Sequence, residues 1–456
     1  MDHELLRHLR HTSWPIVLAM IALMVIGVLA IRASEKADPH MEGFASKQAA
    51  YTAVALAGFL AVTLVPYHRI GAMAYPLFAV TLGLLVLVLA LPANREAHRW
   101  IDLKLVQAQP SELAKLSFIV LLAWYLRYGD HYRRLRGLIV PFGLTFVPMG
   151  LIVIEPDLGT SLLLLPTLYV MLFMAGAKVR HLLVIVALGT VVVLLPVPRK
   201  VDASAFGAAA DRFVVHKAGP VRFYTIEPSL DPKDRPSAPV AYCRFQVGGG
   251  SLYDLQPLCI RVMQRHQAER IEGWLRQDEP GIIQAQGYQL RRSKMVLASG
   301  QWTGRRNWSQ TNSYFRMLPE DHTDFIFSVV GGQWGLLGCL AVLGLYLIVI
   351  VFSMEIATAT HDPFGRLLAL GVLALLSAQV VINVSMTLGL MPITGVTLPF
   401  ISYGGSSLVV NCMALGLLVN VGRHRPILLG KRPFEHGQRK EKPPSPYGPL
   451  ADDAGR

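Results

Sequence analysis

A carboxylate stands at the edge of an apolar run in the stretch LPEDHTDFIFSVVGGQWGLLG, residues 318–338. Asp324, directly before FIFSVV, can accept a proton as a general base. It can equally cap the helix that follows, because an aspartate there accepts hydrogen bonds from free backbone N–H groups and suits the helix dipole. Thr323 can also cap that helix, which would leave the carboxylate of Asp324 available for chemistry. We expect His322 and Asp321 to lie in solvent.

Four further ionisable residues and a tryptophan stand beside apolar runs, where an ionisable group is costly unless it is paired or hydrated. Glu112 and Lys115 stand three apart on a predicted helix and can neutralise each other. Asp157 precedes a helix start and can be an N-cap. Trp100, beside Arg99, can be an interfacial anchor at the level of the lipid headgroups. Each of them is either a structural residue or part of a site.

The segment PITGVTLPFISYGGSS, residues 392–407, is rich in Gly and Ser and lies between two apolar runs. It is typical of a re-entrant turn, whose free backbone groups are tolerated in a membrane only where protein or water covers them. The sequence therefore predicts a cavity at this turn.

The elements that must position these residues are membrane helices. Hydrophobic residues make up 53% of the 456, the mean hydropathy is +0.42 and 16% of the residues are charged, which is outside the range of soluble globular proteins. A span needs about 20 mostly apolar residues. We predict an all-α polytopic membrane protein of about ten helices, the first of them a retained helix and not a signal peptide. The predicted spans are 14–32, 50–66, 74–92, 111–127, 138–154, 158–176, 181–197, 325–352, 367–390 and 400–421.

Lys and Arg in short loops set the orientation, because they stay on the cytoplasmic side. Arg7 and Arg10 place the N-terminus inside, and counting alternately places the C-terminus inside as well. This topology, with the anionic lipid of the inner leaflet, accounts for the formal net charge of +13, and no motif supports nucleic-acid binding. The other cations on the cytoplasmic side are Arg69, Arg127, Arg133, Arg134, Arg136, Lys178, Arg180, Arg423, Arg425, Lys431 and Arg432.

The chain divides into membrane and extramembrane parts. A large extracytoplasmic loop over 198–323 carries a small β-rich insert at about 202–260, where strand-like runs are broken by Pro, Gly and Asp. The basic, Pro-containing tail is predicted to be disordered. The other predicted parts are a cytoplasmic N-terminus (1–13), helices one to seven (14–197), helices eight to ten (324–422) and the cytoplasmic tail (423–456).

Two of the four cysteines, Cys339 and Cys412, lie in predicted helices, and we expect them in apolar core. Cys243 and Cys259 lie in the outward loop, where an oxidising exterior allows a disulfide, although their spacing does not show that they meet. No cluster of His and Cys indicates zinc.

Five stretches together resemble a known family: RW…QPSELAKL, EPDLGTSLLLLP, GYQLRRSK…ASG, LPEDHTDFIFSVVG and GLMPITGVTLPFISYGGSS. They occur in the order and spacing of the SEDS (shape, elongation, division and sporulation) proteins, the RodA/FtsW group. The resemblance covers residues 14–198 and 262–422. The residues of its motifs are closer to the RodA form than to the FtsW form.

The resemblance implies a peptidoglycan glycosyltransferase in the bacterial cytoplasmic (inner) membrane. Such an enzyme polymerises lipid II into glycan strands at the outer face, for cell elongation, and releases undecaprenyl diphosphate. Its implied partner is a class B penicillin-binding transpeptidase, since this chain has no S-x-x-K serine motif for cross-linking. Two alternatives remain: a lipid II flippase, which needs polar groups accessible from both sides in turn, and a non-catalytic scaffold that activates the transpeptidase.

The family's essential aspartate matches Asp324, so the resemblance implies a general base there. The departing lipid diphosphate needs positive charge or a divalent cation, Mg²⁺ or Mn²⁺, and we expect no other cofactor. Trp100 can pack against a sugar face. The candidates for diphosphate contact are Arg99, Lys115, Arg291 and Arg292, and the other substrate-binding candidates are Glu112, Asp157, Ser402, Gly404, Gly405 and Ser406.

The chain departs from the family pattern in two places. Where the family reads VVGEELG, this chain reads VVGGQWG, so Gly332 and Gln333 replace two acids. A role of those acids in binding an ion or in holding the catalytic aspartate therefore does not carry over. The segment from about 200 to 261 has no counterpart in the family pattern.

Overall fold

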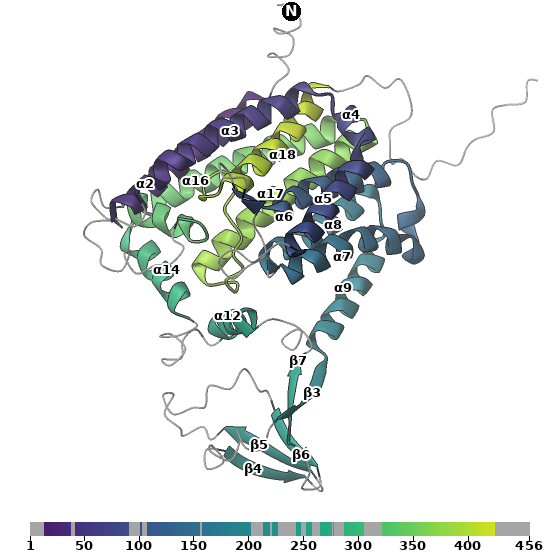
Figure 1. Ribbon diagram of the computed structural model, residues 1–456, viewed down its shortest axis with the longest axis vertical. Coiled ribbons are helices and arrows are strands. Elements are labelled where there is room, and N and C mark those ends of the chain that lie inside the picture. The colour runs from purple at the N-terminus through teal and green to yellow at the C-terminus, as the bar shows by residue number, and fades with distance from the viewer. Residues whose placement is uncertain are drawn as a thin grey trace, which may run out of the picture.

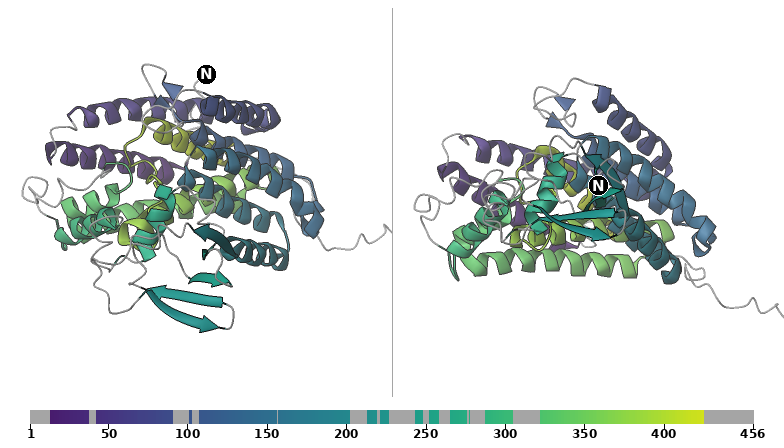
Figure 2. Two further views of the ribbon diagram at one scale, coloured as in Figure 1. Left: turned by 60° about the horizontal axis from the view of Figure 1, so that its bottom comes forward. Right: turned by 90° about the horizontal axis from the view of Figure 1, so that it is seen from below.

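Long helices lie side by side in a bundle, and a small antiparallel sheet projects from it (Figure 1; Figure 2, left). The computed structural model describes residues 13–37, 42–90, 101–102, 107–155, 157–201, 213–218, 221–226, 243–247, 252–257, 265–275, 277, 287–304 and 322–424. The predictions for the N-terminal segment 1–12, the C-terminal tail, Arg99, Trp100, Asp321 and Cys259 lie outside these residues.

Ten helices in the described part of the chain coincide with the ten predicted apolar runs. Seven of them are long and apolar enough to cross a membrane, and α5 and α9 are shorter apolar helices. The last helix begins at Gly405 and not near residue 400, because the residues before it form a non-helical turn. The ten helices are α2 (Trp14–Ala37), α3 (Phe44–Leu64), α5 (Ala74–Ala90), α6 (Pro110–Leu126), α7 (Ile139–Ile154), α8 (Leu158–Ala175), α9 (Val179–Leu194), α16 (Ile326–Ala359), α17 (Pro363–Leu388) and α18 (Gly405–Arg423).

Helix α17 is at the centre of the bundle, where it packs against α6, α8, α16 and α18. Its side chains Leu367 and Leu375 are fully buried. Helix α9, in contrast, exposes apolar side chains: Leu183 and Leu188 are each 62% exposed. Apolar side chains directed away from the protein suit the hydrocarbon of a membrane. The predicted apolar cores of Cys339 and Cys412 are confirmed, since both thiols are buried and free.

Helix α16 is kinked at Gly335, whose φ of 66° and ψ of −163° lie outside the helical region. Such a positive φ is easily adopted only by glycine. The kink brings α16 against the turn after α14 (Tyr288–Ser299), where Leu336 donates its N–H to the carbonyl oxygen of Gln301 (2.8 Å). The opening quarter of α16 is thereby fixed to the extramembrane part.

In the described part of the chain, the sheet has five antiparallel strands in the order β3-β7-β6-β5-β4. Its first strand follows α9 directly and lies before residue 202, where the insert was predicted to start. The two ends of the segment that forms the sheet lie next to each other, because the first strand, β3, pairs with the last, β7. Val201 stands opposite Leu252. The strands are β3 (Pro196–Val201), β4 (Phe213–Ala218), β5 (Val221–Ile226), β6 (Cys243–Val247) and β7 (Leu252–Pro257).

Among the residues that the structure describes, two helices lie between the sheet and α16 in the chain. The first, α12 (Arg265–Leu275), lies between the sheet and the bundle in Figure 1, and α14 packs against α16 and α17. Ser293 of α14 makes a 2.7 Å hydrogen bond between its Oγ and that of Ser328 in α16. The minor elements are α4 (Tyr67–Ala72), the 3-10 helices η2 (His131–Arg133) and η3 (Leu135–Leu138), and the short strands β1 (Ile101–Asp102) and β2 (Gln107–Ala108).

Candidate active site

The segment 389–404, between α17 and α18, is non-helical and is enclosed by protein. Helix α2 approaches it so closely that a Cβ on Gly27 would lie 2.6 Å from the carbonyl oxygen of Ile401. Helix α8 does the same at Gly159, where a Cβ would lie 2.4 Å from the carbonyl oxygen of Thr394. The predicted turn is present and its backbone is covered by neighbouring helices, as irregular backbone in a membrane requires.

Asn383 of α17 joins this turn to the candidate base. Its Nδ2 donates one hydrogen bond to the carbonyl oxygen of Asp324 (2.8 Å) and another to that of Val396 (2.7 Å). Asn383 itself is fully buried. Asn383 was not among the predicted site residues. An isolated Asn in an apolar run indicates that a buried amide needs hydrogen-bond partners, but it does not indicate which ones.

Ser402 makes a second connection between the turn and the start of α16. Its Oγ donates to the carbonyl oxygen of Thr323 (2.6 Å) and accepts the N–H of Leu398 (2.8 Å). Gln48 of α3 donates from Nε2 to the carbonyl oxygen of Ser402 (3.2 Å). The Ser402 hydroxyl thus positions the backbone beside Asp324, and its contact with substrate stays a prediction.

The carboxylate of Asp324 and the guanidinium of Arg270 lie at the same point of the turn. A Cβ placed on Gly395 would lie 3.6 Å from Oδ2 of Asp324 and 3.8 Å from Nη1 of Arg270. Both side chains are half-buried. Gly395 also has a φ of +76°, so the position suits glycine by conformation and by space. A carboxylate and a cation therefore converge where the turn passes the start of α16.

Helix α12 positions Arg270 by docking on the same turn. Trp274, one helical turn after Arg270, donates from Nε1 to the carbonyl oxygen of Gly389 (3.1 Å). Lys294 of α14 lies against Gly389 as well and donates from Nζ to Oε1 of Gln277 (2.6 Å). Sequence reasoning missed Arg270, although its spacing to Trp274 puts a cation and an aromatic ring on one face of a short helix.

His322 is half-buried, so the prediction that it lies in solvent is wrong. Its ring meets the rings of Phe44 (5.2 Å between centroids) and Tyr403 (5.5 Å). The N–H of Tyr403 donates to the carbonyl oxygen of His322 (2.9 Å). Aromatic packing of this kind replaces solvent around the ring and ties the start of α3 to the residues before Asp324.

The predicted pairing of Glu112 with Lys115 is confirmed. Nζ of Lys115 lies 2.8 Å from both Oε1 and Oε2 of Glu112. Glu112 is 4% exposed and Lys115 is 1% exposed. A buried pair at this spacing neutralises both charges. With its ammonium group on Glu112 and almost no exposed surface, Lys115 has no open path to a diphosphate in this geometry.

Asp157 is an N-cap, as one of the two predicted readings had it. Its Oδ1 accepts the N–H of Thr160 in the first turn of α8 (3.1 Å). Its Oδ2 accepts hydrogen bonds from Nε2 of Gln109 (2.9 Å) and Oγ of Ser111 (3.4 Å) at the start of α6. One carboxylate thus joins the beginnings of two helices, and a substrate contact for it stays a prediction.

The glycine and serine candidates at the start of α18 contact Gln109 and Gln48, which also bind Asp157 and Ser402. Gln109 donates its N–H to Oγ of Ser406 (3.2 Å), and Gly404 donates its N–H to Oε1 of Gln48 (3.4 Å). Gly405 is the first residue of α18. These contacts place the candidates around the turn without assigning them a ligand.

The predicted diphosphate ligands Arg291 and Arg292 lie on α14. Ser293 and Leu290 face the bundle and are buried, while Arg291 is exposed and Arg292 is half-buried. The guanidinium of Arg292 lies 5.1 Å from the ring centroid of Tyr288. Their roles stay predictions, as do those of Arg99 and Trp100 outside the described residues.

The two positions without the family's acids belong to a close contact between backbones. A Cβ on Gly300 would lie 3.0 Å from Cα of Gly332, and a Cβ on Gly304 would lie 2.1 Å from the carbonyl oxygen of Gln333. Oε1 of Gln333 is buried and has no hydrogen-bond partner among the described residues. Neither Gly332 nor Gln333 carries a carboxylate. The backbone before α16 is held by the hydrogen bonds from Asn383 and Ser402.

Comparison with known proteins identifies relatives along most of the chain. A family model of cell cycle proteins, named for FtsW, RodA and SpoVE, matches residues 8–204 and 248–427. The stretch between these two blocks contains β4, β5 and β6. Three of the five strands are therefore an addition to what the family model covers.

Three curated relatives have similar lengths. The peptidoglycan glycosyltransferase RodA of Treponema pallidum is 31% identical and covers 89% of this chain and 96% of its own. A probable peptidoglycan glycosyltransferase FtsW of Trichlorobacter lovleyi is 30% identical, covering 89% and 92%. The peptidoglycan glycosyltransferase MrdB of Escherichia coli is 28% identical, covering 92% and 95%.

Solved structures agree with the fold. One, described as showing structural coordination of polymerization and crosslinking by a peptidoglycan synthase complex, is 26% identical with a TM-score of 0.66, covering 91% of this chain and 98% of that one. The crystal structure of the rod shape determining protein RodA of Thermus thermophilus is 25% identical with a TM-score of 0.57, covering 91% and 97%.

Proposed function

The chain belongs to the FtsW, RodA and SpoVE family, and from this premise we propose that it is a peptidoglycan glycosyltransferase of the RodA type. It is a multi-pass bacterial membrane protein that polymerises lipid II into glycan strands for cell elongation. Relatives named RodA, FtsW and MrdB carry this activity in their names. The proposed topology keeps both termini in the cytoplasm and puts Asp324 at the outer face.

The reaction joins the 4-hydroxyl group of one sugar to the anomeric carbon of another. The hydroxyl oxygen forms the new bond, its proton passes to a base, and the bond between the anomeric carbon and the lipid diphosphate breaks. The departing undecaprenyl diphosphate carries away the negative charge. The protein must therefore supply a carboxylate for the proton and cations for the leaving group.

One observation carries the assignment of roles: Asp324 and Arg270 converge on Gly395. We assign the general base to Asp324 and a diphosphate contact to Arg270, whose planar fork of donors suits phosphate oxygens. Asn383 and Ser402 support this arrangement. Asn383 donates to the carbonyl oxygen of Asp324 itself, and Ser402 donates to that of the preceding residue, Thr323. Arg99, Arg291 and Arg292 are further proposed cations for the diphosphate, and Trp100 a platform for a sugar.

A divalent cation stays a proposal of its own. Among the residues that the structure describes, no three His, Cys, Asp or Glu side chains come together as a metal site. We therefore derive no step through Mg²⁺ or Mn²⁺. Polymerisation with and without a chelator, followed by addition of either cation, measures the dependence.

The proposed partner is a class B penicillin-binding transpeptidase. A similar solved structure is described as a complex that coordinates polymerisation with crosslinking, and this chain has no S-x-x-K motif of its own. Glycan strands made here would then be cross-linked by the partner.

The experiment that tests the function is incubation of the purified protein, with its transpeptidase, with labelled lipid II. We expect long glycan strands from the unmodified protein and none from Asp324→Asn. Transfer of lipid II across a vesicle membrane without strand formation would support the flippase. The absence of both strands and transfer with the unmodified protein would support the scaffold. The flippase is disfavoured because the candidate groups around Gly395 gather at one end of the bundle.

A further inference from the structure

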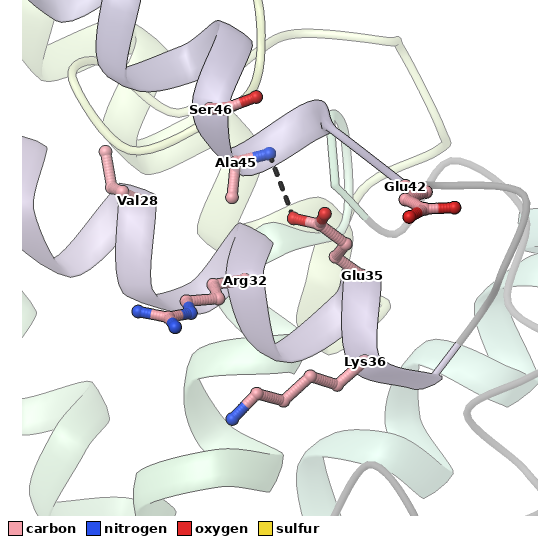
Figure 3. Close-up of a pocket in the computed structure, with 7 residues that line it drawn as sticks. All are labelled: Val28, Arg32, Glu35, Lys36, Glu42, Ala45 and Ser46. Carbon is pink, nitrogen blue, oxygen red and sulfur yellow. Dashed lines mark hydrogen bonds between the residues drawn. The ribbon is translucent and has the colours of Figure 1, made fainter.

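A pocket of about 660 Å³ lies between the end of α2 and the start of α3 (Figure 3). Arg32 and Lys36 line it from α2, and Ala45 and Ser46 line it from α3. The two cations stand four residues apart, so they share one face of the helix. In Figure 3 their side chains extend toward the same side. The pocket therefore presents two neighbouring positive charges.

The acidic residues of this pocket do not neutralise these cations. Glu35 accepts the N–H groups of Gly43 (2.7 Å) and Ala45 (3.2 Å), so its charge is held by the start of α3. Glu42 points away from both cations in Figure 3. Its side chain lies on the far side of Glu35 in that view.

Neither cation has an ion-pair partner among the described residues. The ion pairs there join Lys115 to Glu112 and His68 to Asp362. Both pocket cations are exposed. A guanidinium and an ammonium group beside an open cavity are suited to a phosphate group, which accepts charge-assisted hydrogen bonds from both.

An apolar stripe continues from the cations along the same face of α2. Its members stand three or four residues apart and are exposed: Leu18 (62%), Ile21 (40%), Val25 (52%) and Leu29 (46%). Val28, directly before Leu29 and one helical turn before Arg32, lines the pocket. Side chains at this spacing form one continuous surface on a helix. The surface has the length and polarity to hold an acyl chain below a headgroup.

We propose that this pocket binds the phosphate headgroup of an anionic membrane phospholipid, with one acyl chain along the stripe of α2. Arg32 and Lys36 hold the phosphate, and the negative headgroup matches the local positive charge. The phosphate diester of such a lipid has two non-bridging oxygens that share one negative charge, so the guanidinium and the ammonium group can each donate a hydrogen bond to it.

The site is separate from the proposed catalytic groups. The way from Ala45 to Asp324 leads through the packed rings of Phe44, Tyr403 and His322. The lining residues of the pocket also include neither Asp324 nor Arg270, which favours a structural phospholipid over the polyprenyl diphosphate of the substrate. The inference does not depend on the glycosyltransferase activity, since lipid binding is measured without it.

Native mass spectrometry of the purified full-length protein in detergent tests the proposal, with phosphatidylglycerol titrated against phosphatidylcholine. The variant is Arg32→Gln/Lys36→Gln. The matched control is Arg134→Gln/Arg136→Gln, which removes the same charge from exposed positions in the α6–α7 loop. We expect the Kd of the most tightly bound phosphatidylglycerol to rise at least about tenfold in the variant, and to change less than about twofold in the control.

Three results would overturn the proposal. Unchanged phosphatidylglycerol binding in the Arg32→Gln/Lys36→Gln protein is the first, and an equal loss in the control is the second, because it would show a general effect of charge. The third is displacement of phosphatidylglycerol by an equal concentration of undecaprenyl diphosphate, which would assign the pocket to the polyprenyl carrier. Thermal unfolding of each variant verifies that it is folded.

Discussion

The side-chain amide of Asn383 holds the backbone of Asp324, since Nδ2 donates to the Asp324 carbonyl oxygen over 2.8 Å. The same Nδ2 donates to the turn at Val396 over 2.7 Å. One buried side chain therefore fixes the distance between the proposed base and the segment 389–404. Preorganisation of this kind determines whether a carboxylate meets its substrate in a productive geometry.

Asn383→Leu removes both hydrogen bonds at nearly constant volume. Each carbonyl left without a donor costs about 1–3 kcal/mol of stability, and displacement of Asp324 lowers polymerisation of lipid II by about 10²-fold. The control is Asn420→Leu at the other end of the bundle, where Nδ2 donates to the carbonyl oxygen of Val62 (2.7 Å). The control should lose stability and keep its turnover per folded molecule. Equal loss of turnover in both variants would contradict a positioning role for Asn383.

Asp324→Asn keeps the shape of the side chain and removes the base. We expect a folded, inserted protein whose glycan synthesis falls by about 10²–10⁴-fold. Asp362→Asn is the matched control, because Asp362 caps α17 by accepting the N–H of Gly365 (2.8 Å) and asparagine caps helices equally well. Near-normal strand synthesis by Asp324→Asn, measured on gels of labelled product, would remove the catalytic assignment.

Arg270→Gln should weaken the reaction by about 10–100-fold, the value of a charge-assisted hydrogen bond of about 1.5–3 kcal/mol. Arg270→Lys keeps the charge and should recover part of that loss without the planar fork. Arg69→Gln removes an exposed cation from α4 and serves as the control. If Arg270→Gln polymerises lipid II at the rate of Arg69→Gln, the cation beside Gly395 does not contact the diphosphate.

Glu112→Gln and Lys115→Met each leave one buried ion without its partner. Each single change should cost about 3–5 kcal/mol, whereas the double change should cost less than either, because an unpaired ion at membrane depth is worse than none. Thermal unfolding in one detergent measures all three proteins. Costs that simply add in the double variant would show that the 2.8 Å pair is not energetically coupled. We also expect the single changes to impair activity.

Deletion of 202–251 tests whether the inserted strands form a contact for the transpeptidase. An Asn-Gly linker can join β3 to β7 as a two-residue hairpin turn, because Val201 stands opposite Leu252. We expect insertion and basal polymerisation to persist while co-purification with the transpeptidase weakens. Full-strength co-purification would contradict the contact, and loss of polymerisation with the partner still bound would place the insert in the active site.

Local features of the sequence determined much of this protein. Ten apolar runs predicted ten helices, because the length of an apolar run encodes a span without reference to other parts of the chain. The pairing of Glu112 with Lys115 and the cap by Asp157 were also readable, since both partners lie within one helical turn. The Gly- and Ser-rich turn was predicted because its composition cannot continue a helix.

Contacts between distant residues were decided only by the tertiary structure. Asn383 reaches Asp324 across 59 positions of the chain, and Arg270 reaches Gly395 only because α12 docks on the turn through Trp274. The ring packing of His322 likewise depends on α3, far away in sequence. Helical periodicity states which residues share a face of one helix, but which faces meet depends on how all the helices pack together. The candidate base was visible in the sequence, and the groups that hold it were determined by the fold.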